Sequence, residues 1–179
     1  MKTVPAEYEF YTQSAVMSML AKLSQKEGDY VGQTSSAPWS RLSQHLTELG
    51  VSKGKSILDL GCGNGALSTK IAKHFHSPIH GIDLSNALVE AASQMSIEKG
   101  VDSMCYFTCG DIENLPKLPL LQYDLLLCVG SMYWGLDINK AIGRWAKLMH
   151  SDSTLLIFAN LRIKPLTIDQ QANINNTSF

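Results

Sequence analysis

The chain has 179 residues, a formal net charge of −1 and a charged fraction of 17%. This length is enough for one domain with a sizeable core. The near-zero charge excludes a broad basic surface for nucleic acid, although not a local patch for an RNA. The four cysteines form no CxxC pair, which predicts free buried thiols in a reducing compartment and no metal site. There is no signal-like apolar core and no run of about 18 apolar residues, so we expect a cytoplasmic protein without a membrane segment.

The N-terminal region combines a helical pattern with a polar loop. Apolar side chains recur at roughly helical spacing over residues 8–25, which predicts a packing helix. Glycines and a proline break the pattern over residues 28–40, and this loop carries two large side chains, Tyr30 and Trp39. Such groups either pack on the core or meet a ligand, so both are candidates for a substrate pocket.

The middle of the chain carries its most informative segment. A short strand pattern over residues 56–60, apolar apart from Ser56 and Asp59, leads into three glycines at alternate positions, and a helical pattern begins at Ala66. A strand that turns through glycines into a helix exposes bare backbone and unpaired helix N–H groups to a ligand. Asp59 interrupts the strand, and a buried carboxylate needs a partner. It either stabilises the turn as a cap, or orients the loop and faces a cationic ligand group. The loop consists of Gly61, Cys62, Gly63, Asn64 and Gly65.

Strand and helix patterns then alternate to residue 159. Because crossovers between parallel strands are right-handed, this alternation predicts an α/β fold: a doubly wound, Rossmann-like, mostly parallel sheet in the order 3-2-1-4-5, with helices on both faces. The expected later strands are 78–84, 104–109, 123–129 and 153–159, and the expected helices are 66–75, 86–98 and 138–149.

Acidic residues follow the ends of successive strands. Asp83 lies about 20 residues beyond the glycine loop, where an acid can accept hydrogen bonds from ribose hydroxyls. A helix N-cap is the alternative, but Ser85 is better placed for that role. Asp111, after the third strand, suits an Asx turn when considered alone. With Asp59, these acids are expected to converge on one crevice at the carboxyl edge of the sheet.

The segment from Asp59 to Gly65 resembles the first motif of class I S-adenosylmethionine-dependent methyltransferases. In that family the glycine loop wraps the methionine and ribose parts of the cofactor, and the preceding acid supports the loop and the methionine amino group. Gly61, Gly63 and Ala66 also satisfy the dinucleotide spacing G-x-G-x-x-A, so an NAD-dependent oxidoreductase stays open. Asp59 and Gly65 favour the methyltransferase.

The resemblance implies a cofactor site along the carboxyl edge of the sheet. There Asp83 would bind the ribose and Leu84 would lie against the adenine. Asp111 would accept a hydrogen bond from the adenine amine, with Ile112 packed on the ring. The implied cofactor-binding residues are Asp59, Gly61, Cys62, Gly63, Gly65, Asp83, Leu84, Asp111, Ile112, Gly130 and Ser131.

The acceptor side of the site is less well defined by the sequence. The resemblance implies that the loop after the fourth strand borders the methyl-acceptor pocket, and that the N-terminal helix forms a lid over the mouth of the site. No catalytic residue is identified beyond Tyr133, a weak candidate for a general base. The candidate substrate-pocket residues are Tyr30, Trp39, Tyr133 and Trp134.

The implied function is transfer of a methyl group from S-adenosylmethionine to an O, N or C nucleophile, with a small molecule as acceptor. The alternatives are a catalytically silent cofactor-binding subunit and a tRNA-modifying methyltransferase. Residues 33–39 faintly resemble tRNA wobble-uridine methyltransferases, with Ser35 or Ser36 at the position of an arginine in that family.

The expected organisation has three parts: an N-terminal lid segment over 1–50, a cofactor-binding domain over 51–160 and a tail over 161–179. We expect the last two strands of the family's sheet to be missing. The fifth strand would then present an open edge, which a homodimeric or heterodimeric partner would cover.

Overall fold

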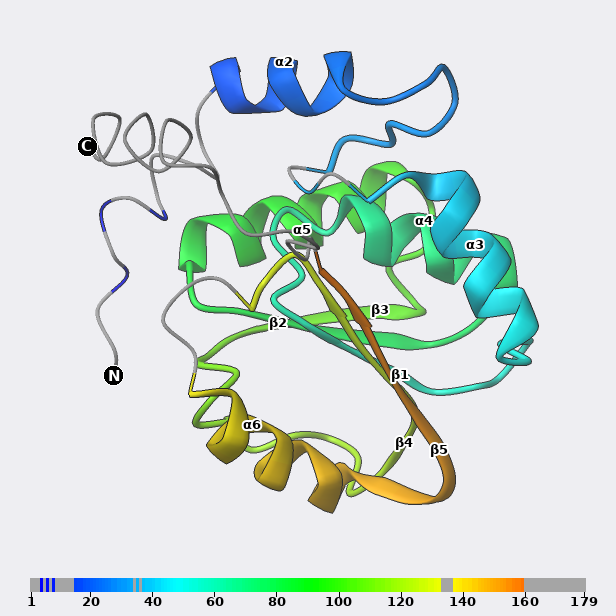
Figure 1. Cartoon of the computed structure of the whole chain (residues 1–179), viewed down its shortest axis with the longest axis vertical. Coiled ribbons are helices and arrows are strands. Elements are labelled where there is room, and N and C mark those ends of the chain that lie inside the picture. The colour runs from blue at the N-terminus through cyan, green and yellow to red at the C-terminus, as the bar shows by residue number, and fades with distance from the viewer. Residues whose placement is uncertain are drawn as a thin grey trace, which may run out of the picture.

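The computed structural model describes residues 4, 6, 8, 15–33, 35, 37–132 and 137–159. Its centre is a parallel sheet of five strands in the order β3-β2-β1-β4-β5 (Figure 1). This is the order predicted from the alternation of strand and helix patterns. The strands are β1 (Ile57–Leu60), β2 (Ile79–Asp83), β3 (Cys105–Cys109), β4 (Tyr123–Val129) and β5 (Met149–Phe158).

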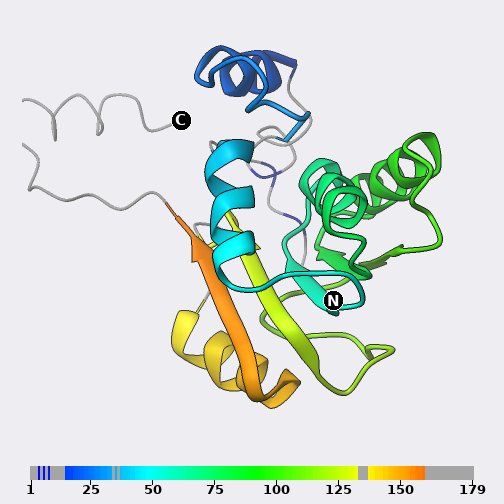
Figure 2. The ribbon, with the colours of Figure 1, turned by 90° about the vertical axis from the view of Figure 1, so that its right-hand side faces the viewer.

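Helices cover both faces of this sheet. In Figure 1, α4 and α5 lie on one face and α6 on the other, while α2 lies farther from the sheet beyond α4 and α5. Figure 2 shows β4 and β5 running side by side, in agreement with their parallel pairing. The helices are α2 (Ala15–Leu23), α3 (Trp39–Glu48), α4 (Ala66–Phe75), α5 (Asn86–Glu98) and α6 (Ile138–Trp145), followed by the 3-10 turn η1 (Ala146–Leu148).

Strands β1 and β4 are mostly apolar, and both of their faces are covered. On β4, Leu125 and Leu127 pack into a cluster with α3 and α4, whereas Leu126 and Cys128 pack into a second cluster with α6. Side chains alternate between the faces of a strand, so a strand that is buried on both sides reads as a continuous apolar run. Within β1 the only ionisable residue is Asp59, and it is buried as well.

The segment between α6 and β5 corrects two expectations. The helix expected over 138–149 ends at Trp145, and the strand expected from residue 153 already begins at Met149, which pairs with Tyr123. The register then shifts before Leu125 pairs with Thr154. Residues 150–153, between the expected helix and the expected strand body, are therefore an irregularity inside β5, where the Ser153 hydroxyl donates to the Tyr123 carbonyl at 2.7 Å. This cross-strand contact depends on tertiary pairing, which local sequence patterns do not report.

Within the described part of the chain, no helix is both long enough and apolar enough to cross a membrane. The same residues contain no cluster of histidine, cysteine or acidic side chains able to hold a metal ion.

Candidate functional site

The glycine loop forms a tight left-handed connection between β1 and α4. Gly61, Gly63 and Gly65 all have positive φ, at 83°, 56° and 73°, a conformation that side chains with a Cβ rarely adopt. A Cβ at Gly65 would lie 2.6 Å from the Ala92 Cβ, so this glycine lets α4 and α5 approach each other. A Cβ at Gly63 would meet nothing within 4 Å. The backbone of Gly63 is therefore accessible to a ligand.

Backbone hydrogen bonds attach the start of this loop to the neighbouring strand. The N–H groups of Gly61 and Cys62 both donate to the Ile82 carbonyl, at 2.8 and 3.0 Å. The Cys62 side chain is buried, and burial raises the pKa of its thiol well above the usual value. Cys62 thus contributes its backbone to the site, while its thiol stays protonated and unreactive.

Asp59 is fixed beneath the loop by α4. The Ser68 hydroxyl donates to its Oδ2 at 2.5 Å, and the carboxyl is fully buried. Burial raises the pKa of Asp59 to about 6, the Ser68 hydrogen bond opposes this shift, and the nearby charge of Asp83 adds to it. The hydrogen bond fastens the end of β1 to α4, and the loop-orienting role of Asp59 stays a prediction. The buried carboxyl would favour a nearby cation.

Asp83 joins the end of β2 to the glycine loop. Its Oδ2 accepts the Gly63 N–H at 2.9 Å, and its Oδ1 accepts the Ser85 N–H at 2.9 Å. The Tyr8 hydroxyl contacts both oxygens, at 2.7 and 2.8 Å. Burial raises the pKa of Asp83, while these hydrogen bonds act in the opposite direction. The N-cap of α5 is Ser85, as expected, because its hydroxyl oxygen accepts the Leu88 N–H.

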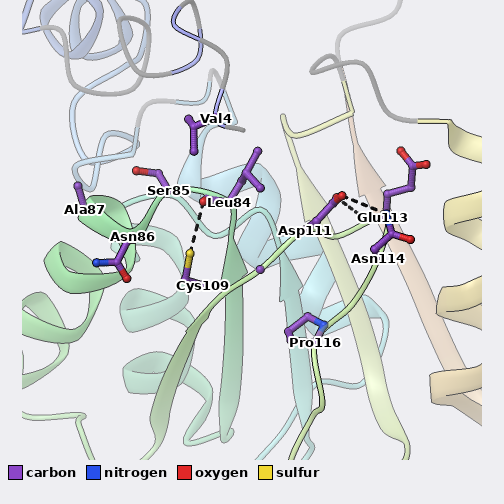
Figure 3. Close-up of a pocket in the computed structure, with 11 residues that line it drawn as sticks. Val4, Leu84, Ser85, Asn86, Ala87, Cys109, Asp111, Glu113, Asn114 and Pro116 are labelled. Atoms are coloured by element: carbon purple, nitrogen blue, oxygen red, sulfur yellow. Dashed lines mark hydrogen bonds between the residues drawn. The ribbon is translucent and has the colours of Figure 1, made fainter. Parts of the chain in front are cut away.

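A cavity of about 1020 Å³ opens beside Asp83, between the ends of β2 and β3 (Figure 3). Leu84 and Asp111, both predicted to contact adenine, line it. The Asp111 carboxylate also accepts the Glu113 N–H at 2.8 Å, so the Asx turn considered as the alternative is present too. The remaining lining residues are Val4, Ser85, Asn86, Ala87, Cys109, Gly110, Glu113, Asn114 and Pro116.

Ile112, predicted to pack on the adenine, is not among the residues that line the cavity. Its side chain packs against the core cluster on the α6 side of the sheet, and its carbonyl accepts the Trp145 Nε1–H at 2.8 Å. Arg144, on the same helix, donates to the Glu113 carbonyl and to Asn114 Oδ1. Helix α6 therefore holds the loop that carries Asp111.

The end of β4 packs directly against the glycine loop. The Ser131 hydroxyl donates to the Gly61 carbonyl at 3.0 Å, and a Cβ at Gly61 would lie 2.1 Å from Ser131 Oγ. Gly130 approaches Ser35, since its added Cβ would lie 3.2 Å from the Ser35 Cβ. Ser35 Oγ is buried and has no hydrogen-bond partner within the described part of the chain. Buried hydroxyls usually have partners, so this group is a candidate to bind a ligand.

Over residues 51–176 the sequence matches the family model described as a methyltransferase domain. The chain belongs to the methyltransferase domain family. The domain is 35% identical over 97 residues to the ubiquinone biosynthesis O-methyltransferase of Coxiella burnetii, an alignment that spans 54% of this chain and 40% of that protein. It is 28% identical over 109 residues to the ajmaline N-methyltransferase of Rauvolfia serpentina, spanning 61% of this chain and 37% of that protein. The chain thus covers less than half of the length of these relatives.

The fold of the methyltransferase domain also occurs in solved structures. A SAM-dependent methyltransferase from Thiobacillus denitrificans, in complex with S-adenosyl-L-homocysteine, has a TM-score of 0.65 and 21% identity, covering 87% of this chain and 56% of that one. These comparisons confirm the family and the fold class predicted from the glycine loop and the strand order.

The methyltransferase domain brings most of the predicted cofactor residues to one edge of the sheet. Trp39, by contrast, packs on α4. Its ring centroid lies 5.4 Å from that of His74, and the Lys70 ammonium lies 5.3 Å from the centroid of the Trp39 ring. Tyr30 is half-buried in the loop before α3. The predicted residues Tyr133 and Trp134 lie outside the described residues.

Sequence patterns did not assign two residues that complete the site. Tyr8 contacts Asp83 although the two are 75 positions apart, and only its helical spacing and a general lid role were apparent beforehand. Asn64 donates to the Gly32 carbonyl at 2.9 Å and thereby fastens the loop before α3 to the glycine loop. Its position between Gly63 and Gly65 was the one available signal.

Proposed function

We propose that this methyltransferase domain binds S-adenosylmethionine at the carboxyl edge of its sheet and transfers the methyl group to an O, N or C nucleophile of a small molecule. The observation that carries the proposal is the junction of Gly63 and Asp83, where a buried carboxylate is bound by the N–H of a glycine with open space beside it. A ligand that carries ribose hydroxyls would find at one point an uncovered backbone and a carboxylate acceptor, which the Tyr8 hydroxyl contacts in the free protein.

The residues present fit the parts of this cofactor. The cavity beside Asp83 has the volume of a small-molecule site, with Leu84 as an apolar wall and Asp111 as an acceptor for the adenine amine. Asp83 would bind the ribose hydroxyls. Asp59, held by Ser68 under the glycine loop, would favour the methionine ammonium over a neutral group.

Bound S-adenosylmethionine supplies an electrophilic methyl group on its sulfonium. The chain's own contribution is then to orient the cofactor, to align it with the acceptor and to exclude water. The Ser131 hydrogen bond to Gly61 and the Asn64 hydrogen bond to Gly32 hold the glycine loop between two neighbouring segments. A rigid loop of this kind supports alignment better than a mobile one.

The acceptor is inferred from the relatives. One is named as an O-methyltransferase of ubiquinone biosynthesis and the other as an N-methyltransferase of ajmaline, which favours a small molecule and leaves the methylated atom open. The charge of −1 gives no long-range attraction for RNA, so a tRNA acceptor is the weaker alternative.

Calorimetric titration with S-adenosylhomocysteine tests the cofactor site. We expect micromolar binding to the wild type and at least tenfold weaker binding to Asp83→Asn, a loss of about 1.4 kcal/mol or more, because an amide cannot accept from a diol at both of its positions. The control is Asp102→Asn, an exposed acid outside the cavity, which should bind like the wild type.

Three outcomes would contradict the proposal. A folded wild-type protein that binds NAD but not S-adenosylhomocysteine would point to the oxidoreductase. Equal affinities of the wild type and Asp83→Asn would remove Asp83 from the cofactor site. Binding of S-adenosylmethionine without turnover on any small-molecule acceptor would favour the silent cofactor-binding subunit.

A further inference from the structure

The hydroxyl of Tyr8 lies at the position where Asp83 would receive a ribose. It is 2.7 Å from Oδ1 and 2.8 Å from Oδ2 of Asp83, so one oxygen atom bridges both carboxylate oxygens. The Tyr8 side chain is buried, with 9% of its surface exposed. This contact is therefore an enclosed one and not a passing surface interaction.

The Tyr8 hydroxyl takes the position, in contact with both Asp83 oxygens, that a ribose diol would need. A carboxylate offers about four lone-pair positions, two on each oxygen. Oδ1 faces the Ser85 N–H and the Tyr8 hydroxyl, and Oδ2 faces the Gly63 N–H and the same hydroxyl. The backbone donors, which also include Leu84, belong to the strand end and the glycine loop, which form the site itself. Tyr8 is the partner that can leave without dismantling it.

The neighbouring cavity, which the proposed function assigns to the adenine, is open and is not filled by the described residues of the N-terminal stretch. Val4 lines the cavity together with Leu84 and Asp111, yet leaves it open with a volume of about 1020 Å³ (Figure 3). Val4 lies only four positions before Tyr8 in the sequence. The same N-terminal stretch thus borders an open base cavity and fills the adjacent ribose position.

We propose that Tyr8 is an intramolecular competitor of the cofactor ribose, so that S-adenosylmethionine must displace its hydroxyl from Asp83 in order to bind. The inference rests on the proposed function, because it assigns the Asp83 carboxylate to a ribose diol. Displacement is chemically reasonable: a diol brings two O–H hydrogens to two oxygens, whereas Tyr8 shares a single hydrogen between them. The apparent affinity is then reduced by the fraction of molecules in which Tyr8 occupies Asp83.

Titration of Tyr8 variants of the full chain with S-adenosylhomocysteine tests this competition. Tyr8→Phe keeps the ring but removes the hydroxyl, and Tyr8→Ala removes both. We expect both variants to bind S-adenosylhomocysteine about tenfold more tightly than the wild type, because the competing state is no longer stabilised. The matched control is Tyr106→Phe, which removes a hydroxyl from a tyrosine that is 61% exposed on β3 and should leave the affinity unchanged.

A second ligand separates competition at the ribose from a general loosening of the site. Adenine carries no ribose and does not need Asp83, so its affinity, measured by NMR titration, should be the same in the wild type and in Tyr8→Phe. An equal gain for adenine and for S-adenosylhomocysteine would overturn the inference.

The remaining outcomes distinguish the inference from the proposed function. If the wild type binds S-adenosylhomocysteine and Tyr8→Phe binds it equally or more weakly, the cofactor site stands and the competition is refuted. If folded wild type, Tyr8→Phe and Tyr8→Ala all fail to bind, the cofactor site itself is refuted, and the inference falls with it. Binding of S-adenosylhomocysteine by the variants but not by the wild type would support both the cofactor site and the competition by Tyr8.

Discussion

At the scale of single residues, Asp59 combines a stability cost with a role at the site. Its folded pKa is about 6 because of burial, above the value of about 3.9 in an unfolded chain. A carboxyl with a raised folded pKa stabilises the fold at acidic pH, and this stabilisation is lost as the pH rises through 6. Above that pH the folded protein holds a buried charge, and among the described residues its side-chain hydrogen bond comes from Ser68. The cost at neutral pH is up to about 3 kcal/mol.

Asp59→Asn should therefore stabilise the free protein at pH 7 and weaken the binding of S-adenosylhomocysteine. The amide oxygen can still accept the Ser68 hydroxyl, but it carries no charge to bury and none to offer a methionine ammonium. We expect a gain of about 1–3 kcal/mol in urea unfolding at pH 7, which shrinks towards pH 4, with several-fold weaker binding by calorimetry. A variant that is less stable than the wild type at both pH values would contradict this account.

At the scale of elements, α6 acts on the cofactor site through the loop after β3. Arg144 donates to the Glu113 carbonyl and Asn114 Oδ1, and Glu113 and Asn114 line the cavity together with Asp111. Arg144→Gln should release this loop and weaken S-adenosylhomocysteine binding by about threefold to tenfold, while the melting temperature changes little because Arg144 is exposed. Lys147→Gln, an exposed substitution on the adjacent η1 turn, is the control. Unchanged affinity in Arg144→Gln would remove Arg144 as a positioning residue.

The same scale shows why some elements were predictable and others were not. Glycine spacing and apolar periodicity predicted the β1–α4 turn to within one residue, because that turn depends on local φ values and on burial of both strand faces. The start of β5 at Met149 was missed because it depends on pairing with Tyr123, 26 positions earlier. The contact between Tyr8 and Asp83 is likewise a tertiary contact without a local pattern. The positions of the acids were predictable because each lies at, or just after, the carboxyl end of a strand, and these ends share one edge of the sheet.

At the scale of the whole molecule, two buried ionisable groups lie on opposite faces of the sheet and respond to acid in opposite directions. Asp59 lies under α4, where it is bound by Ser68. His80 lies on the α6 side, where its ring nitrogens contact the Tyr123 hydroxyl at 3.0 Å and the Thr108 hydroxyl at 2.8 Å. Burial lowers the pKa of His80 to about 4, below the value of about 6.5 in an unfolded chain. The neutral imidazole is thus part of the fold, and its contribution is present above pH 6.5 and lost as the pH falls towards 4.

These two effects nearly compensate each other between pH 7 and pH 5. Over this interval the folded state gains about 1.3 kcal/mol from protonation of Asp59 and loses about 2 kcal/mol from His80. We therefore expect the free energy of unfolding to change by less than about 1 kcal/mol on account of this pair in the wild type. His80→Gln removes the stability loss that comes from protonation of His80, so acidification to pH 5 should stabilise this variant by about 1 kcal/mol relative to pH 7. Asp59→Asn removes the stability gain that comes from protonation of Asp59, so the change from pH 7 to pH 5 should destabilise this variant by about 2 kcal/mol.

Urea unfolding of the wild type and the two variants at pH 7 and pH 5 measures these differences, and the comparison within each protein cancels any structural cost of the substitution itself. Groups elsewhere in the chain contribute the same pH dependence to all three proteins, so the contrast between the variants isolates the pair. Identical pH dependence in His80→Gln and Asp59→Asn would mean that neither group keeps its shifted pKa in the folded protein. Because the two sites are separated by the sheet, the double variant should have the sum of the two single effects, and a clear departure from additivity would indicate that acid acts through one shared network instead.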